Sequence, residues 1–101
     1  MSSRITLASV VCVTESQVSS RVGEEIVILE LGAGHYYGLE GTGTAIWELV
    51  QKPIRVSEIR NEILRSFDVE REVCERDLIQ ILQEMVDKSI IAELSPSDPP
   101  I

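Results

Sequence analysis

The stretch Glu25–Leu39, EIVILELGAGHYYGL, decides the fold of this chain. In Glu25–Leu31 the β-branched and leucine residues alternate between two faces, which predicts a strand at the centre of a sheet. Gly32–Gly34 is typical of a hairpin loop, because glycine tolerates positive φ angles. His35–Leu39 then predicts a short neighbouring strand, so the stretch as a whole predicts an antiparallel hairpin.

A further strand precedes this hairpin. Val18 and Val22 lie on one side of a short extended segment, and Gly23 provides the turn that follows it. Three strands are about the minimum for an independently stable sheet, and only when helices cover one face. An apolar stretch, Ile5–Val13, comes before them.

Helical patterns occupy the second half of the chain. Residues 41–94 are rich in Glu, Arg, Leu and Ile, and their spacing predicts three helices that open near Gly41–Thr44, Ser57 and Glu70. The candidate N-caps are Thr42 or Thr44 for the first helix and Ser57 for the second. The second helix is expected to close at Phe67–Asp68, the third to end at Lys88, and Ile90–Leu94 to return as a short extended segment.

The order of these patterns predicts the fold class. Strands come first and helices second, without alternation, which favours an α+β domain over a parallel sheet with crossover helices. We therefore expect a three-stranded antiparallel sheet followed by three helices, in a winged helix-turn-helix-like architecture. The expected domain spans residues 1–94, and Ser95–Ile101, with three prolines, is expected to be a flexible tail.

Composition excludes several classes of protein. With 101 residues and a hydrophobic fraction of 44%, the chain is long enough for one modest core and too apolar for a disordered protein. Its formal charge of −8 argues against a nucleic-acid backbone or an anionic membrane surface as partner. No apolar run reaches a membrane-spanning length, and Met1–Ser9 does not resemble a secretory signal, so we expect a cytoplasmic protein in which Cys12 and Cys74 are reduced.

The residues that could carry chemistry are few. His35 is the single histidine, and its spacing from Cys12 and Cys74 is not that of metal ligands, so no metal and no cofactor is predicted. Cys74 lies in an apolar helical row, where cysteine is usually a small hydrophobe. We expect no enzymatic activity; the alternative, Cys74 as a nucleophile, predicts that Cys74→Ala abolishes activity without loss of ligand binding.

The winged-helix likeness raises a second alternative, a DNA-binding protein. A DNA reader of that kind places its third helix in the major groove. Between Glu70 and Lys88 the chain carries six acidic and three basic residues, a net charge of −3 that repels phosphates. DNA binding is therefore disfavoured, although a protein-interaction adaptor of the same architecture stays open.

A peptide-binding module fits the pattern better. The strand His35–Leu39 is short and flanked by glycines, which suits an exposed sheet edge that an extended peptide can join. The apolar stripe of the third helix is wider than a core face needs and is expected to form a wall beside that edge. The competing interpretation is that these helix residues all belong to the core.

The run Ile28–Val50, ILELGAGHYYGLEGTGTAIWELV, resembles the PqqD-like family, the recognition elements that bind leader peptides of ribosomally synthesised and post-translationally modified peptides. The matching segments, which together span about residues 17–94, are Leu29–Leu31, Gly34–Leu39, Gly43–Ala45, Ile46–Leu49, Val56–Ile59, Phe67–Val69, Asp77–Leu82, Met85–Val86 and Ile90–Ile91. Two turn positions depart from the pattern: Glu40 replaces a common Asn, and Ser89 replaces a common Gly.

The resemblance implies a site and partners. A leader would lie between the third strand and the third helix, on the strand side against Glu30, Leu31, His35, Tyr36, Tyr37 and Gly38, and on the helix side against Arg71, Cys74, Arg76, Asp77, Leu78, Ile81, Leu82 and Met85. A discrete chain of this length is similar to the stand-alone recognition protein of lasso peptide biosynthesis, which implies a leader-cleaving cysteine peptidase and an ATP-dependent cyclase as partners. Leu39, Trp47, Ile59 and Ile63 are expected in the core.

Overall fold

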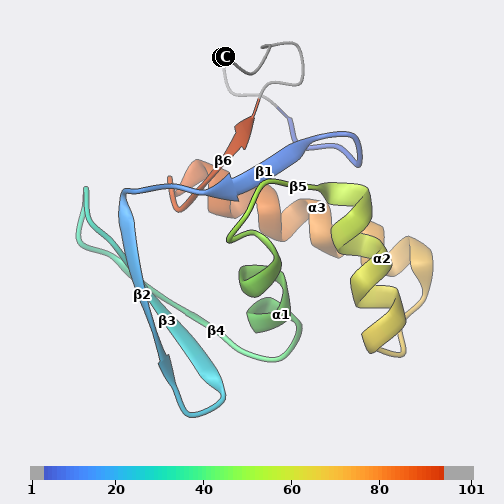
Figure 1. Cartoon of the computed structure of the whole chain (residues 1–101), viewed down its shortest axis with the longest axis horizontal. Coiled ribbons are helices and arrows are strands. Elements are labelled where there is room, and N and C mark those ends of the chain that lie inside the picture. The colour runs from blue at the N-terminus through green and yellow to red at the C-terminus, as the bar shows by residue number, and fades with distance from the viewer. Residues whose placement is uncertain (1–3, 95–101) are drawn as a thin grey trace.

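The computed structural model describes residues 4–94, which form two small antiparallel sheets and three helices (Figure 1). The strands are β1 Val10–Val13, β2 Gln17–Val22, β3 Glu25–Glu30, β4 Tyr36–Leu39, β5 Ile54–Arg55 and β6 Ile91–Leu94. The helices are α1 Thr42–Leu49, α2 Val56–Ser66 and α3 Arg71–Asp87. The α+β fold predicted from the sequence is therefore confirmed, and the predicted tail, residues 95–101, lies outside the described part of the chain.

The predicted hairpin stretch forms the first sheet, in the strand order β2-β3-β4. Ile26 and Ile28 of β3 are buried, and β3 pairs with β2 on one side and with β4 on the other. The register of β4 on β3 sets Ile28 opposite Tyr37 and Leu29 opposite Tyr36. Because successive strand residues point to opposite faces, the even-numbered residues of β3 face the core.

The carboxylate of Glu30 organises the loop between β3 and β4. It accepts hydrogen bonds from the backbone N–H groups of Gly32, at 2.6 Å, and Ala33, at 2.9 Å. A Cβ atom on Gly32 would lie 2.6 Å from Glu30 Oε2, so only glycine leaves room for this contact. Gly34 follows with a φ of 76°, in the left-handed region that glycine adopts without strain.

A second sheet, in the order β5-β1-β6, is not predicted by the local sequence pattern. In it Val11 of β1 lies opposite Ile54 of β5 and opposite Glu93 of β6. The apolar stretch near the start of the chain and the extended return after α3 thus become neighbours. This sheet holds the beginning, the middle and the end of the described chain together (Figure 1).

The helices begin differently from the prediction. The N-cap of α1 is Gly41, with a φ of 59°, and Thr44 Oγ1 donates to its carbonyl at 2.7 Å instead of capping a free N–H. The N-cap of α2 is Arg55. Neither helix has a side-chain cap, so the predictions of Thr42, Thr44 and Ser57 as N-caps are wrong. Instead, α1 begins after the turn at Gly41 that follows β4, and α2 begins directly after β5, which pairs with β1.

The end of α3 closes in a Schellman turn. The N–H of Ile90 donates to Met85 O at 3.1 Å, and the N–H of Ser89 donates to Val86 O at 3.0 Å. Ser89 has a φ of 65°, the conformation for which glycine is the usual residue at this position. The departure at Ser89 therefore leaves the turn intact but places a side chain in the left-handed region.

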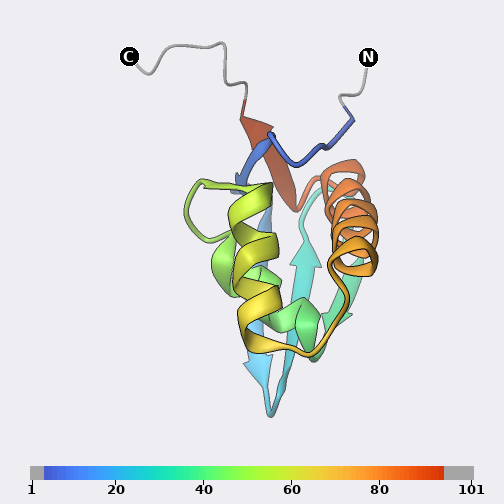
Figure 2. The ribbon, with the colours of Figure 1, turned by 90° about the vertical axis from the view of Figure 1, so that its right-hand side faces the viewer.

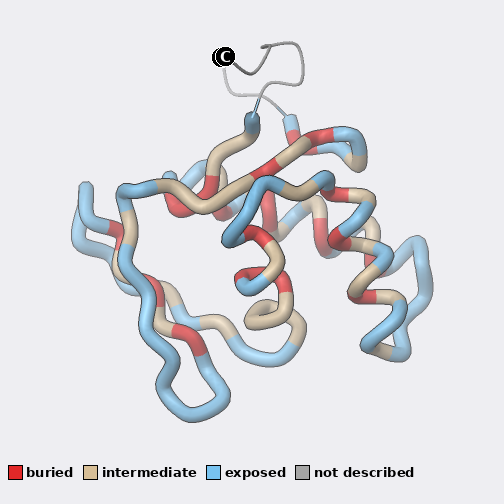
Figure 3. The backbone as a smooth tube through the Cα atoms, in the orientation of Figure 1, coloured by how far each residue is buried: buried red, intermediate tan, exposed pale blue. Residues whose placement is uncertain are grey.

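The core lies where the helices face the two sheets (Figure 3). Trp47, Ile59 and Ile63 are buried, as predicted, and Leu39 packs partly buried against them. Trp47 Nε1 also donates to Ser19 Oγ of β2 at 3.3 Å, which ties α1 to the first sheet. Among residues 4–94, no helix is both long and apolar enough to cross a membrane.

Candidate functional site

Strand β4 is an edge of the first sheet, and its free side offers unpaired backbone groups. The N–H of Glu30 donates to His35 O at 2.8 Å, so the carbonyl of His35 points toward β3. Hydrogen-bonded positions alternate along an antiparallel pair, so the backbone N–H and C=O groups of Tyr37 and Leu39 also point toward β3. The N–H and C=O groups of Tyr36 and Gly38 therefore point away from the sheet.

The side chains of β4 divide between the two faces of the sheet. Tyr37 and Leu39 are half-buried and pack against the core. Tyr36 is 70% exposed on the opposite face. Nothing lies within 4 Å of the position where Gly38 would carry a Cβ atom. The edge is thus open on its outer face and bounded by packed side chains on its inner face.

The C-terminal end of α3 contacts β4 through Tyr37. Lys88 Nζ lies 4.8 Å from the centre of the Tyr37 ring, which is cation–π geometry. The Tyr37 ring also packs edge-to-face with His35, with the ring centres 6.4 Å apart. These contacts anchor one end of α3 beside the β4 edge (Figure 2).

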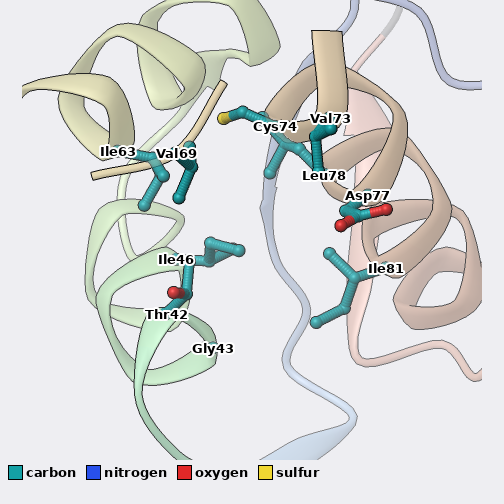
Figure 4. A pocket seen from close by; sticks show the side chains of 10 residues that line it. All are labelled: Thr42, Gly43, Ile46, Ile63, Val69, Val73, Cys74, Asp77, Leu78 and Ile81. Carbon is teal, nitrogen blue, oxygen red and sulfur yellow. The ribbon is translucent and has the colours of Figure 1, made fainter. Parts of the chain in front are cut away.

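An apolar cavity of about 200 Å³ lies between α1 and the N-terminal half of α3 (Figure 4). It is lined by Thr42, Gly43, Ile46, Ile63, Val69, Val73, Cys74, Asp77, Leu78 and Ile81. Since β4 ends at Leu39 and α1 opens at Thr42, this cavity lies at the end of the β4 edge. The edge and the cavity together form the candidate site.

The predicted helix residues separate into two groups. Cys74, Asp77, Leu78 and Ile81 line the cavity, as the sequence suggested for a peptide-facing wall. Leu82 and Met85 are 0% and 3% exposed and do not line the cavity, whereas Cys74 and Leu78, equally buried at 6% and 3%, line it from the core. The cavity-lining surface of α3 is therefore narrower than its apolar stripe.

The residues predicted on the strand side of the site lie partly at the β4 edge and partly in or after β3. His35, Tyr36, Tyr37 and Gly38 are at the edge or next to it. The carboxylate of Glu30 is used by the loop amides, and Leu31 follows β3 as an exposed residue.

The predicted arginines are partnered. Arg71 Nε lies 3.3 Å from Glu75 Oε2, and Arg60 Nη1 of α2 lies 2.7 Å from the same oxygen. The hydrogen bond from Arg60, with that from Arg71, lowers the pKa of Glu75 below its ordinary value despite partial desolvation. Arg71 is thus held toward α2. Arg76 and Asp77 are exposed neighbours with 3.7 Å between Nε and Oδ1.

The thiol of Cys74 is held in its neutral form. Burial is the main cause that raises its pKa, and the neighbouring carboxylates Glu75 and Asp77 add to it, while Arg60 opposes them. A cysteine nucleophile needs the opposite shift, because the thiolate is the reactive species. Within residues 4–94, no three His, Cys, Asp or Glu side chains are grouped as they would be around a metal ion.

Several residues of the site were not predicted from the sequence. Val73 shares a helical row with Asp77 and Ile81, at a spacing of four residues, and that spacing is the signal that could have identified it. Val69 and Lys88 carry no such local signal, since their places depend on how α3 packs against α1 and β4.

A comparison with protein families identifies the family of this chain. The model of the family described as coenzyme PQQ synthesis protein D, PqqD, matches residues 25–91, about two thirds of the chain. The chain belongs to the PqqD family. The resemblance seen in Ile28–Val50 is thereby confirmed. A search of curated proteins found no significant match to this PqqD family member.

Two solved structures share the fold of this PqqD family member. A structure described as TbiB1 in complex with the TbiA(beta) leader peptide is 29% identical, with a TM-score of 0.74, and the match covers 88% of this chain and 99% of that one. A structure described as lasso peptide synthetase B1 complexed with the leader peptide is 16% identical, with a TM-score of 0.72, covering 80% of this chain and 95% of that one.

Proposed function

We propose that this protein binds the leader region of a ribosomally synthesised precursor peptide in lasso peptide biosynthesis, as a strand added antiparallel to β4. The observation that carries this proposal is the pair of outward-facing backbone positions, Tyr36 and Gly38, beside an apolar cavity. An exposed strand edge offers main-chain hydrogen bonds to an extended peptide, and adjacent pockets select its side chains. The likeness to TbiB1 in complex with a leader peptide supports the same conclusion.

The register of the edge sets how the peptide would lie. Two peptide residues, two positions apart, would each exchange N–H···O=C bonds with Tyr36 or Gly38. The peptide residue between them, opposite Tyr37, would point its side chain to the inner face. An antiparallel peptide runs from the Leu39 end toward the His35 end, so an inner-facing side chain nearer the leader N-terminus would reach the cavity.

The cavity would supply most of the selectivity. A cavity of about 150 Å³ is known to take up a benzene ring, so the roughly 200 Å³ here can hold one branched or aromatic side chain. The exposed Asp77 lines the cavity and can pair with a basic leader residue, whereas Arg76 lines a separate hollow with Arg4 and Gln80; an exposed ion pair contributes under about 1 kcal/mol. Apolar anchors in a desolvated pocket should therefore dominate the affinity.

The decisive experiment compares Gly38→Pro with Gly38→Ala. Proline removes the outward N–H of residue 38 without removing a bond to β3, whereas alanine keeps that N–H and meets no atom within 4 Å. An unmade bond to the peptide costs about 1–3 kcal/mol, so we expect Gly38→Pro to weaken binding of a labelled synthetic leader about 5- to 160-fold by fluorescence anisotropy. Gly38→Ala should stay within about threefold of the parent protein. Equal binding by both variants, with circular dichroism showing both folded, would rule out strand addition.

We further infer that the protein delivers the bound leader to a leader-cleaving cysteine peptidase and an ATP-dependent cyclase, and catalyses no step itself. The open edge presents the peptide without enclosing it, so the segment beyond the leader stays accessible to another enzyme. The neutral Cys74 thiol, buried beside two carboxylates, supports a role in packing and not in nucleophilic attack.

A further inference from the structure

The outer face of the β2-β3-β4 sheet is uncovered and mostly apolar, with Ser20 opposite Val27 and Glu25 opposite Val22 as its polar positions. Val18, Leu29 and Tyr36 form one row across the three strands, and Val27 and Val22 lie on the same face. The helices all lie on the other side of this sheet (Figures 1 and 2). An antiparallel sheet with one face in solvent normally alternates apolar and polar residues. Here Val18, Val22 and Tyr36 are 53%, 61% and 70% exposed, so both outer strands present apolar side chains to solvent on this face.

Uncompensated negative charge borders this surface, the outer-face patch of Val18, Val22, Val27, Leu29 and Tyr36. Glu24, Glu25 and Glu40 surround a hollow beside Val22 at one end of the sheet. None of the three takes part in an ion pair within the described residues 4–94. Arg21, on the neighbouring strand, is already paired with Glu48. A matching partner surface would therefore be apolar at its centre and basic at its rim.

The negative charge of the chain also favours a different protein over a second copy of this chain as the occupant of the outer-face patch. A formal charge of −8 opposes association of two identical chains, and two copies of this patch would bring like-charged rims close together. A basic rim on another protein removes that repulsion and speeds the encounter. The observations thus favour a heterologous partner.

We propose that the outer-face patch docks the enzyme that processes the peptide bound at β4, through an apolar surface of that enzyme ringed by lysine and arginine. This proposal rests on the proposed leader binding. A peptide strand beside β4 would extend the same face next to Tyr36 and Gly38. The enzyme would then contact the patch and alternate side chains of the peptide together, so each should raise the affinity of the protein for the other by the same factor.

The test changes the patch far from the peptide edge. Val18 and Val22 lie on β2, with β3 between them and β4, so Val18→Glu combined with Val22→Glu should leave leader affinity within about twofold of the parent. The probe is a purified cysteine peptidase that cleaves the same leader, titrated by biolayer interferometry with the leader present. We expect the double variant to weaken enzyme binding at least tenfold. Leu94→Glu, an exposed apolar residue on β6 of the other sheet, is the matched control and should change little.

A second pair of changes tests the acidic rim. Glu24→Lys combined with Glu25→Lys should weaken enzyme binding, and the parent protein should lose enzyme affinity as salt rises. If the double valine variant does not fold, Val22→Glu alone, at the most exposed valine of the patch, replaces it.

Two results would overturn the proposal. One is a folded double valine variant that binds the enzyme as tightly as the parent. The other is sedimentation showing that the parent protein is a dimer that the double variant dissociates, which would assign the patch to a second copy. Failure of the parent to bind leader, measured in a separate titration without enzyme, would instead defeat the proposed function.

Discussion

Two adjacent residues of α3, Ile81 and Leu82, have opposite surroundings. Leu82 is fully buried in the core, whereas Ile81 is half-buried and lines the cavity between α1 and α3. Their sequence positions differ by one residue, or about 100° around the helix. A single turn of α3 thus carries both a residue that holds the fold and a residue that is available to a ligand.

The position of Ile81 in the cavity wall, outside the fully buried core, predicts the outcome of Ile81→Asp. A carboxylate in the cavity would remove an apolar anchor, so leader binding should weaken at least tenfold while the thermal unfolding transition persists. Gln80→Asp, an exposed neighbour outside the cavity, is the control and should bind like the parent. Loss of the folded state in Ile81→Asp would show that Ile81 belongs to the core and that the ligand-facing row on α3 is misplaced.

At the scale of elements, the turn that ends α3 contains avoidable strain. A non-glycine residue in the left-handed region costs roughly 1–2 kcal/mol, and glycine costs about 0.5–1 kcal/mol in the unfolded chain. We therefore expect Ser89→Gly, at a φ of 65°, to raise the free energy of unfolding in urea by about 0.5–1 kcal/mol. Ser66→Gly, at the last residue of α2, should lower it, since that position is helical. A Ser89→Gly protein no more stable than the parent would contradict this account.

Local patterns predict the elements that carry their own periodicity. The alternation in β3, the glycine loop after it and the apolar rows of α3 each specify one element, and all three are confirmed. The second sheet has no such signal, because β5 is two residues long and β1 finds its partners some 40 and 80 residues away. Pairing between distant short strands is decided by how the whole chain packs, not by neighbouring residues.

The site is predictable only in part for the same reason. The edge strand follows from the order of the strands, and Val73, Asp77 and Ile81 follow from helical spacing. Which side of the broad α3 stripe faces the core depends on where α1 and the first sheet meet it, and the residues Leu82 and Met85 could not be separated from Ile81 by period alone.

At the scale of the whole molecule, β4 has three surfaces with different surroundings. Its inner face packs on the core through Tyr37 and Leu39, its edge presents Tyr36 and Gly38, and its outer face continues the apolar row. A domain of this size has little interior in which to enclose a substrate. In the proposed complex, a short strand that contacts the core, the peptide and the enzyme would instead bring the last two together.

Delivery of the precursor to the peptidase can be measured as the rate of leader removal. Adding this protein to purified peptidase and full-length precursor should raise the rate of leader removal until the precursor is saturated with the protein. Gly38→Pro should need a higher protein concentration for the same rate, since it lowers only peptide affinity. The readout is mass spectrometry of the released leader, and a rate that is the same with and without the protein would exclude delivery.

The shortness of β4 also bears on solubility. Unpaired strand edges are sites at which partly folded chains join one another and begin to aggregate, and long flat edges are the most hazardous. Here the free edge offers the outward groups of two residues, Tyr36 and Gly38, before the chain turns at Gly41 into α1. An incoming strand can therefore gain only a few backbone bonds unless its side chains also fit the cavity, which protects the protein from indiscriminate pairing while it waits for its peptide.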